Sequence, residues 1–287
     1  MTNPASSTPI FLSGLPGRMA TEVALATRDE PWASRLRLLD VGLTGPGGPA
    51  TQEIDGATVR LLPPDARDAL DVPGGAIAVD FTEPTAALPN IAFYAARGIP
   101  FVLGTTGFDT EQARRLVAAS SASAVIAPNM AIPIVLLQWA VAQAAARFPG
   151  ALAGHAFGVM ESHQSTKKDT SGTARALVRD FAKLGLPASE DAIKKIRDPR
   201  VQERELGVPP EHLTGHAYHY YTLSAGDGDV RLELRHLVNG RRVYATGALH
   251  AVEFLARRVA AGSRGQVYSM LDVLEAMHEQ PWAQRGP

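Results

Sequence analysis

The chain has 287 residues, 45% of them hydrophobic and 20% charged, which suits a globular protein with one large domain or two smaller ones. Its net charge of −1 and pI near 6.7 give no reason to expect a nucleic acid or another polyanion as partner. The absence of cysteine excludes disulfides, thiolate catalysis and cysteine-ligated metal, and we expect no metal site.

The first residues, MTNPASSTPIFLSG, contain neither a basic region nor a long apolar stretch, so they do not predict a signal peptide. The apolar stretch from Ala131 to Ala146 is interrupted by Pro133, Gln138 and Gln143, which indicates a buried helix and not a membrane span. We therefore expect a cytoplasmic protein with no membrane partner.

Strands and helices alternate from residue 9 to about residue 131. Short apolar runs predict buried strands, and segments with helical periodicity lie between them. The expected strands are 9–13, 35–44, 57–62, 76–82 and the first halves of 99–107 and 124–130; the expected helices are 21–29, 84–98 and 110–122. This alternation predicts βαβ units, a parallel sheet and a domain of the size that binds one nucleotide.

The pattern changes after residue 131. A helix over 133–148, an alternating strand over 155–163 and a helix over 172–185 come first. The segments 216–224, 229–238 and 241–247 then alternate like antiparallel strands, with a hairpin loop over 224–229 and a turn at Asn239-Gly240. Helices over 248–260 and 266–277 follow. We expect a mixed, mostly antiparallel sheet with one open face.

A glycine-rich stretch, GLPGRM, lies between the first strand and the first helix. Glycines at that junction let the backbone approach a pyrophosphate, and the helix dipole favours the anion. The motif lacks one glycine of G-x-G-x-x-G, so an ordinary turn is the alternative, but the strand–helix context favours a cofactor loop. We expect Gly14, Gly17, Arg18 and Met19 to bind a dinucleotide.

The end of the second strand bears on which dinucleotide is used. Enzymes that prefer NAD often carry Asp or Glu there to bind the ribose 2′-OH. Here the strand ends at Thr44, which we expect to contact the cofactor, while Asp40 lies inside the strand. No carboxylate would repel a 2′-phosphate, and Arg18 would pair with one, so the sequence favours NADPH, with NADH possible. The alternative is that Arg18 is only a solvated residue at the helix start.

Three later strands end in turn-forming residues, and the carboxyl ends of parallel strands are where ligands bind in such sheets. Any one of these loops would be explained by ordinary turn chemistry. Together with the glycine loop, they indicate a nicotinamide site. The candidate cofactor contacts are Phe81, Thr82, Gly104, Thr105, Thr106, Pro128, Asn129 and Met130.

The stretch ESHQSTKKDTSGTA crowds charge in front of a helix start. His163 is a candidate proton carrier because histidine titrates near neutrality, and Lys167 can bind or protonate an anion. Gly172 and Thr173 lie at the helix N-terminus, where backbone N–H groups suit a carboxylate. A solvated loop before a capped helix is the alternative. If the segment is functional, its pattern predicts a site for a small anion with a proton donor beside it.

Basic residues also flank the predicted turn at Asn239-Gly240. As exposed hairpin charges they would need no function. As a binding group, Arg241 would reach the carboxylate of the same small anion with two parallel hydrogen bonds.

Six segments together resemble one enzyme family: GLPGRM, VDFTEP, GTTGF, APNM, ESHQSTKKDTSGTA and RHLVNGRRVYATGAL. Their order and spacing, from about residue 10 to about residue 275, are similar to those of 4-hydroxy-tetrahydrodipicolinate (dihydrodipicolinate) reductases of lysine and diaminopimelate biosynthesis. Common bacterial members carry two adjacent histidines and Asp-Ala-Pro-Ser-Gly-Thr. This chain has His163-Gln164 and DTSGT, which resembles the plant-type branch.

The resemblance implies an oxidoreductase that uses NAD(P)H to reduce a cyclic, unsaturated dicarboxylate after the hydroxylated substrate loses water. His163 and Lys167 would be the proton-transfer pair, while Gly172 and Thr173 would bind a substrate carboxylate. Gln164 would contact substrate in place of the second histidine, but an amide cannot titrate.

The resemblance also implies an α/β fold with two domains. A Rossmann-type, parallel-sheet nucleotide domain would comprise residues 1–131 plus 250–287. An inserted α+β domain, residues 132–249, would bind substrate and mediate oligomerisation through its open sheet. We expect a homo-oligomer, either a dimer or a tetramer.

Two other functions fit parts of the sequence. Another two-domain NAD(P)-dependent oxidoreductase, such as an amino-acid dehydrogenase, would share the glycine loop but would not need His163, Lys167, Gly172 and Thr173 together. A non-catalytic nucleotide-binding sensor would keep the cofactor loop and lose the proton donors, which this chain retains.

Overall fold

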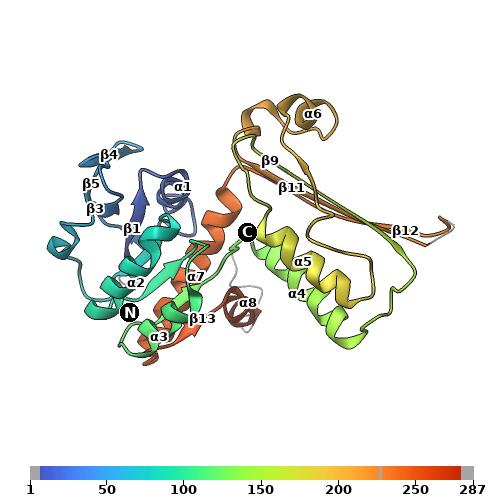
Figure 1. Ribbon diagram of the computed structural model, residues 1–287. Coiled ribbons are helices and arrows are strands. Elements are labelled where there is room, and N and C mark those ends of the chain that lie inside the picture. The colour runs from blue at the N-terminus through green and yellow to red at the C-terminus, as the bar shows by residue number, and fades with distance from the viewer. Residues whose placement is uncertain (1–6, 226–227, 279–287) are drawn as a thin grey trace. The chain divides into compact units, whose positions relative to one another are not determined.

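The computed structural model describes residues 7–225 and 228–278, which form two compact units. The second unit is the continuous stretch Pro133–Val243, and the first combines the described residues before it with those from Tyr244 onward. The chain thus re-enters the first unit at Tyr244, whereas the sequence placed that boundary at residue 250. Each unit contains its own sheet (Figure 1).

The sheet of the first unit confirms the predicted parallel, Rossmann-type arrangement. Its described strands follow the order β13-β8-β7-β6-β1-β3-β5-β4, with β2 beside β1, and only β4 and β5 pair antiparallel. The strands are β1 (Thr8–Leu15), β2 (Leu36–Leu38), β3 (Val41–Thr44), β4 (Thr51–Ile54), β5 (Ala57–Leu62), β6 (Ile77–Asp80), β7 (Phe101–Leu103), β8 (Ala124–Ile126) and β13 (Val267–Tyr268).

Helices connect these strands, and their ends follow from local sequence. Pro84 occupies the first turn of α2, where a missing N–H costs nothing, and Gly98 ends that helix in the left-handed conformation, with φ of 62°. The Asp109 carboxylate caps α3 by accepting a hydrogen bond from the Gln112 N–H. The helices of this unit are α1 (Arg18–Ala26), η1 (Arg67–Ala69), α2 (Pro84–Arg97), α3 (Thr110–Ala118), α7 (Arg242–Ala260) and α8 (Met270–His278).

The second unit has the predicted mixed sheet, in the order β10-β9-β11-β12, with β10 parallel to β9 and the other pairs antiparallel. Two long helices pack on one face, where Val159, Leu177, Phe181 and Tyr221 share a core (Figure 1). The elements are α4 (Ile132–Arg147), β9 (Ala156–His163), α5 (Gly172–Lys183), β10 (Lys194–Ile196), α6 (Pro199–Arg204), η2 (Pro210–His212), β11 (His216–Ser224) and β12 (Arg231–Asn239).

The predicted strand over 241–247 is wrong: these residues begin helix α7. Asn239-Gly240 is accordingly not a hairpin turn but the link from β12 into that helix. Val243 and Tyr244 favour strands intrinsically, yet tertiary packing overrides this preference. A side chain at Gly247 would place its Cβ 1.7 Å from the Met130 carbonyl oxygen, so the helix packs backbone to backbone there.

Other differences are smaller. The expected strand over 35–44 is split into β2 and β3, and the sequence reading missed the short strands β4, β10 and β13. Part of the expected hairpin loop over 224–229 lies outside the described residues. Within the part of the chain that is described, no helix is long and apolar enough to cross a bilayer.

Candidate active site

The loops expected to bind the cofactor follow parallel strands, so they gather at one edge of the first sheet. β1, β3, β6, β7 and β8 run in the same direction through parallel pairings. Their carboxyl ends therefore bring together the stretches that begin near Gly14, Thr44, Phe81, Gly104 and Pro128.

The glycine loop leaves no room for side chains. A Cβ at Gly14 would lie 2.7 Å from the Phe81 carbonyl oxygen, and Gly14 has a φ of 104°, which disfavours any other residue. A Cβ at Gly17 would lie 2.5 Å from the Gly14 carbonyl oxygen, which accepts a hydrogen bond from the Gly17 N–H at 2.7 Å. Gly17 directly precedes α1, so the helix N-terminus is exposed to a ligand without a side-chain cap.

A buried carboxylate organises the neighbouring loop. Asp80 accepts hydrogen bonds from the N–H and hydroxyl of Thr82, from the Asn90 amide and from the Tyr94 hydroxyl. Burial raises the pKa of Asp80, and these donors act against that rise. Ser13 completes the network through its hydrogen bond with Tyr94 at 2.6 Å. The network fixes the backbone of the loop that follows β6.

The loop after β7 is tied to the loop after β6. The Thr105 hydroxyl donates a hydrogen bond to the Thr82 carbonyl oxygen at 2.8 Å. The Phe81 ring covers Gly104 so closely that a Cβ there would lie 2.1 Å from the ring. The predicted contacts Phe81, Thr82, Gly104 and Thr105 therefore form one connected structure.

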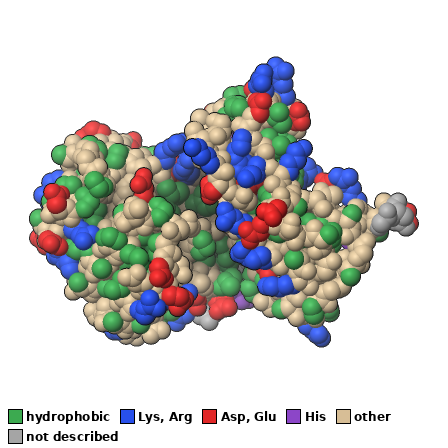
Figure 2. All heavy atoms as spheres, viewed as in Figure 1, with side chains coloured by type: hydrophobic (Ala, Val, Ile, Leu, Met, Phe, Trp, Pro, Cys, Tyr) green, Lys and Arg blue, Asp and Glu red, His purple; other side chains and the backbone are tan. Residues whose placement is uncertain are grey.

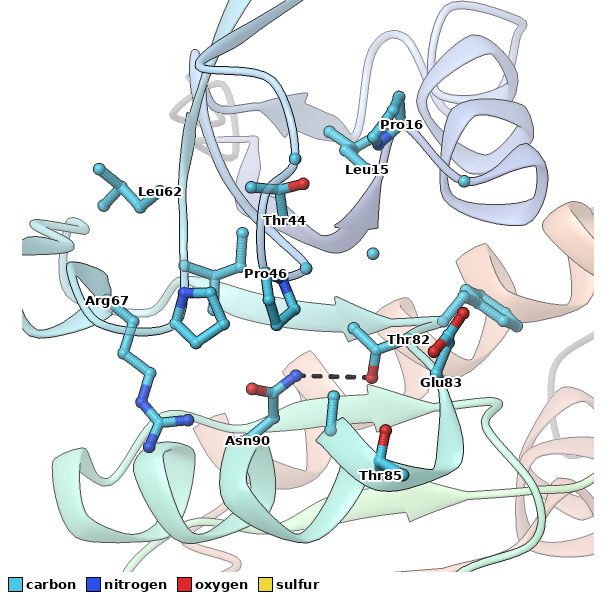
Figure 3. A pocket seen from close by; sticks show the side chains of 18 residues that line it. Leu15, Pro16, Thr44, Pro46, Leu62, Arg67, Thr82, Glu83, Thr85 and Asn90 are labelled. Carbon is cyan, nitrogen blue, oxygen red and sulfur yellow. Dashed lines mark hydrogen bonds between the residues drawn. The ribbon is translucent and has the colours of Figure 1, made fainter.

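A cavity of about 360 Å³ opens at this edge of the sheet (Figure 3). Five of the predicted cofactor residues line it: Gly14, Gly17, Thr44, Phe81 and Thr82. Its other lining residues include Pro46, Gly48, Arg67, Glu83, Thr85 and Asn90, which the sequence reading missed. Figure 3 shows Arg67 and Glu83 at opposite ends of the cavity, with Thr44 and Pro46 between them.

The Thr44 hydroxyl fits a bound nucleotide, because its oxygen is buried with no hydrogen-bond partner among the described residues. Gly48 packs directly against this oxygen, since a Cβ at that position would lie 2.1 Å from it. An orphaned hydroxyl between two glycine-rich loops is a ready partner for a ribose or phosphate oxygen. The residues present therefore suit a dinucleotide cofactor.

Eight predicted cofactor residues are absent from this cavity lining: Arg18, Met19, Gly104, Thr105, Thr106, Pro128, Asn129 and Met130. Met130 is buried, with 2% of its surface exposed, so its side chain serves the core. The Asn129 side-chain oxygen accepts a hydrogen bond from the Ala131 N–H at 2.9 Å and shapes the loop after β8. Arg67 lines the cavity, whereas Arg18, the arginine expected from the sequence, does not.

In the second unit, β9 carries Glu161 and His163 on the face covered by α5, because alternate residues of a strand share a face. Both are buried, with 0% and 7% of their surfaces exposed. Across the sheet, His219 of β11 lies opposite Glu161, and His236 of β12 lies opposite His219. The register thus assembles three imidazoles and a carboxylate on one face.

Glu161 ties this cluster to the charged loop and to the start of α5. Its carboxylate accepts hydrogen bonds from the Arg197 guanidinium and from the Ser171 N–H, the latter at 2.9 Å. Burial alone would raise the pKa of Glu161, but His219, Arg197 and the Ser171 N–H outweigh it and lower that pKa to about 2. Glu161 is therefore an ionised, buried carboxylate at neutral pH.

Arg197 extends from Glu161 to the loop before α5. Its Nε donates to the Lys167 carbonyl oxygen at 2.8 Å, and a terminal nitrogen donates to the Asp169 carbonyl oxygen at 3.3 Å. The Lys167 ammonium in turn pairs with the Asp169 carboxylate at 2.8 Å. The loop is therefore built around a buried ion pair and is not simply a solvated turn.

The start of α5 lies beside this ion pair. Ser171 is the N-cap residue, but its side chain makes no capping hydrogen bond, and its N–H is used by Glu161. Gly172 and Thr173 occupy the first turn, where N–H groups have no acceptor within the helix itself. Space around Gly172 is open. Lys and Arg side chains are spread over the visible face of this unit, with Asp and Glu among them (Figure 2).

Burial changes the expected chemistry of His163. Its pKa is lowered to about 3, first by burial and then by His219, against a smaller opposing effect of Glu161. His163 is therefore neutral at neutral pH in the structure described here, whereas the sequence suggested a group that titrates there. A neutral imidazole offers one N–H donor and one acceptor nitrogen.

The remaining predicted substrate contacts lie near these groups. Gln164 follows His163 at the end of β9, and its carbonyl oxygen accepts a hydrogen bond from the Lys167 N–H at 3.0 Å. The Arg241 guanidinium lies against Gly215, where an added Cβ would be 2.8 Å away. The β9–β11 register places Gly215 beside the end of β9.

Glu161, His163 and His219 offer atoms within 4.8 Å of one another, a grouping that resembles a metal site. Both Glu161 oxygens already accept hydrogen bonds, one of them from the cationic Arg197. A protein cation at that carboxylate competes with a metal ion. The cluster is therefore held together as a hydrogen-bonded network.

Sequence reasoning missed several members of this site: Glu161, Arg197, His219 and His236. The alternation of β9 carried a usable signal for Glu161, because it places Glu161 and His163 on one face. The two other histidines also lie on alternating strands, but their meeting depends on strand register. Arg197 lies 36 residues after Glu161 in the sequence, and no local pattern links them.

Comparison with solved structures shows a shared fold. A dihydrodipicolinate reductase from Paenisporosarcina sp. TG-14, described as dipicolinate bound, is 19% identical, with a TM-score of 0.58 over 93% of this chain and 98% of that one. A DAP dehydrogenase from C. glutamicum is 10% identical, with a TM-score of 0.51 over 93% of each chain. At these identities the likeness concerns the fold alone, which reductases and dehydrogenases share.

Sequence comparison identifies the family. The family model "Dihydrodipicolinate reductase, N-terminus" matches residues 8–130, and "Dihydrodipicolinate reductase, C-terminus" matches residues 133–274. The 4-hydroxy-tetrahydrodipicolinate reductase 2 of Arabidopsis thaliana is 44% identical over 69% of this chain, an alignment that spans 57% of that protein. The Oryza sativa protein named "Probable 4-hydroxy-tetrahydrodipicolinate reductase 2, chloroplastic" is 37% identical over 93% of this chain and 83% of its own length.

A bacterial relative completes the comparison. The 4-hydroxy-tetrahydrodipicolinate reductase of Nitrosomonas eutropha is 31% identical over 92% of this chain and 97% of its own length. The higher identity of the plant proteins agrees with the plant-type features of the charged loop. The chain therefore belongs to the dihydrodipicolinate reductase family of NAD(P)H-dependent oxidoreductases.

Proposed function

We propose that this protein reduces 4-hydroxy-tetrahydrodipicolinate to tetrahydrodipicolinate with NADPH, as a step of lysine and diaminopimelate biosynthesis. One observation carries the proposal: the Glu161–Arg197 ion pair holds Lys167 and the start of α5 beside a buried histidine. That arrangement suits a small dicarboxylate and a proton donor. A nucleotide-binding sensor would need neither.

Each residue of the second unit has a proposed role. Gly172 and Thr173 bind one substrate carboxylate through first-turn N–H groups, where the helix dipole favours an anion. Arg241 binds a carboxylate through its guanidinium, and Gln164 orients the substrate with its amide. Lys167 is the proton donor, and its ammonium also attracts the dianion. His163, neutral in the free protein, contributes a hydrogen bond to the substrate.

The first unit is proposed to hold NADPH. A nicotinamide held there would supply the hydride once the substrate has lost water, and Lys167 would supply the proton that completes the reduction. Gly14 and Gly17 provide backbone approach to the pyrophosphate, and Thr44 binds the ribose. Arg67 is a further cation at the same cavity and replaces Arg18 as our candidate partner for the 2′-phosphate.

Gly17→Asp is expected to weaken NADPH binding by at least about tenfold. The new Cβ would meet the Gly14 carbonyl oxygen at 2.5 Å, and the carboxylate would face the pyrophosphate. Calorimetric titration with NADPH measures the effect, and circular dichroism checks that the variant is folded. Unchanged affinity in a folded variant would mean that this loop does not bind the cofactor.

NADPH is expected to support a kcat/KM at least as high as NADH does. The reasons are the missing acidic side chain at Thr44 and the arginine that lines the cavity. Initial rates with each cofactor at saturating substrate, compared in the parent and in Arg67→Ala, measure the preference. A strong preference for NADH in the parent protein would contradict the proposed role of Arg67.

We further propose a homo-oligomer that uses the open face of the second sheet. That face has a shallow hollow lined by Met160, Tyr220 and Arg235, and helices α4 and α5 pack on the opposite face. Sedimentation velocity over a range of protein concentrations tests this. A monomer at all concentrations would contradict the proposal.

The test of the reaction is a coupled assay in which dihydrodipicolinate synthase generates the unstable substrate in situ. NADPH consumption should then depend on both the synthase and this protein. Oxidation of diaminopimelate or other amino acids with NADP⁺ tests the rival function, and we expect no activity above background.

A further inference from the structure

Three imidazoles form a chain across the sheet of the second unit. His163 Nε2 lies 3.2 Å from His219 Nε2, and His219 Nδ1 lies 3.4 Å from His236 Nδ1. Each contact joins two ring nitrogens, so one nitrogen of each pair must carry a hydrogen and the other must accept it. When all three rings are neutral, such a chain can run in only two directions.

The three rings are neutral near pH 7. Burial is the largest cause, and it lowers the pKa of His163 and of His236 to about 3 and lowers that of His219 as well. Each ring therefore carries one hydrogen. The position of that hydrogen in one ring decides its position in the other two.

The far end of the chain favours one direction. His236 Nε2 is buried and has no hydrogen-bond partner among the described residues. If His163 donated to His219 and His219 donated to His236, the hydrogen of His236 would lie on Nε2 and have no acceptor. The reverse direction leaves only a bare lone pair. Orphaned buried N–H groups are rarer in proteins than under-satisfied acceptors, so the reverse direction is preferred.

The carboxylate beside the chain favours the same direction. Glu161 Oε2 lies 3.8 Å from His219 Nε2. Glu161 is held ionised by Arg197, and a negative charge stabilises an N–H on the facing nitrogen more than a lone pair. His219 therefore keeps its hydrogen on Nε2, from which it donates to His163 Nε2.

We infer that His219 is a positioning residue that holds His163 in the tautomer with its hydrogen on Nδ1. The hydrogen bonds run from His236 Nδ1–H to His219 Nδ1, and from His219 Nε2–H to His163 Nε2. The Nδ1–H of His163 remains as the donor at the end of the chain. Contact between this N–H group and the dicarboxylate rests on the proposed function. His163 then supplies an oriented hydrogen bond, and Lys167 remains the source of the proton.

Nitrogen NMR of histidine-labelled protein tests the tautomers without any substrate. Long-range ¹H–¹⁵N correlations near pH 7.5 distinguish protonated from bare ring nitrogens, and single histidine variants assign the signals. We expect hydrogen on Nδ1 of His163, on Nε2 of His219 and on Nδ1 of His236. Hydrogen on Nε2 of His163 would overturn the inference, whether or not the protein is active.

Kinetics test the consequence. His219→Leu should lower kcat by about 10²-fold, less than the roughly 10⁴-fold loss that a wrong histidine tautomer causes in a serine protease. His219→Gln should recover much of that loss, because its amide can place an N–H near the position of Nε2. NADPH affinity should stay unchanged in both variants.

His216→Leu is the matched control. His216 also lies on β11 with 2% of its surface exposed. Its Nε2 contacts the Ser162 hydroxyl and makes no contact with the three linked imidazoles. His216→Leu should lower the free energy of unfolding about as much as His219→Leu does, but it should leave kcat nearly unchanged. Equal losses of kcat in His216→Leu and His219→Leu, or no recovery in His219→Gln, would reduce His219 to a packing role. Expected tautomers in a parent protein that does not turn over the substrate would refute the proposed function and leave the inference standing.

Discussion

Lys167→Ala is expected to lower kcat/KM for the dicarboxylate by about 10²–10⁴-fold, because it removes the positioned proton donor. KM should also rise, since the ammonium attracts the dianion in the ground state as well as in the transition state. The side chain is 22% exposed and pairs with an exposed Asp169, so folding stability should change by only about 1 kcal/mol or less. Steady-state kinetics with thermal denaturation measure both quantities.

Lys168→Ala provides a matched control for this prediction. Lys168 is the next residue, carries the same charge and is exposed. Its loss should change kcat/KM by no more than a fewfold, through the general field of the loop. Similar losses in the two variants would indicate that the loop acts only as a diffuse positive surface. Near-normal kcat/KM in Lys167→Ala would exclude Lys167 as the proton donor.

Arg197→Met is expected to lower the free energy of unfolding by about 3 kcal/mol at pH 7. The change leaves the fully buried Glu161 carboxylate without its cation, and breaking one side of a buried ion pair typically costs about 3–5 kcal/mol. It also removes the hydrogen bonds that Arg197 donates to the carbonyl oxygens of Lys167 and Asp169. Denaturant unfolding of parent and variant measures the difference.

The pH dependence of this difference has a definite sign. In the parent, the pKa of Glu161 is about 2, below its unfolded value, so its stabilising effect is present at neutral pH and is lost as pH falls toward 2. In the variant, loss of the cation leaves burial less opposed and raises that pKa above its value in the parent, so acidification neutralises the uncompensated charge. The difference in free energy of unfolding between parent and variant should therefore become smaller as the pH falls from 7 to 4.

Arg179→Met controls for the loss of an ordinary ion pair. Arg179 pairs with Glu190 at 2.9 Å, but their side chains are 61% and 44% exposed, and such surface pairs contribute at most about 1 kcal/mol. If Arg197→Met cost no more than Arg179→Met, or if the gap widened on acidification, Glu161 would not be the buried carboxylate that organises the loop.

Much of the fold follows from sequence periodicity. The apolar runs of β1, β6 and β7 are followed by Ser13, Asp80 and Gly104 respectively, and α2 carries both its start and stop signals at Pro84 and Gly98. The start of α7 could not be predicted in this way. Val243 and Tyr244 favour strands, and the close approach of the Gly247 backbone to Met130, far away in the sequence, is a tertiary contact that no local pattern reveals.

The candidate site was predictable where one segment carries the chemistry. His163, Lys167 and the start of α5 fall within a few residues of one another, so spacing alone suggests an anion site. Glu161, Arg197 and His219 come from different elements, and only the strand register and the loop path bring them together. The lowered pKa of His163 also depends on burial by those elements, which a single segment does not reveal.

The most direct test of the central claim is NADPH consumption in the coupled assay, with dihydrodipicolinate synthase supplying the substrate. We expect absorbance loss that scales with the amount of this protein, stops when the synthase is omitted, and nearly disappears with Lys167→Ala but not with Lys168→Ala. Absence of turnover in a folded parent protein that binds NADPH would contradict the assignment as a reductase of this dicarboxylate.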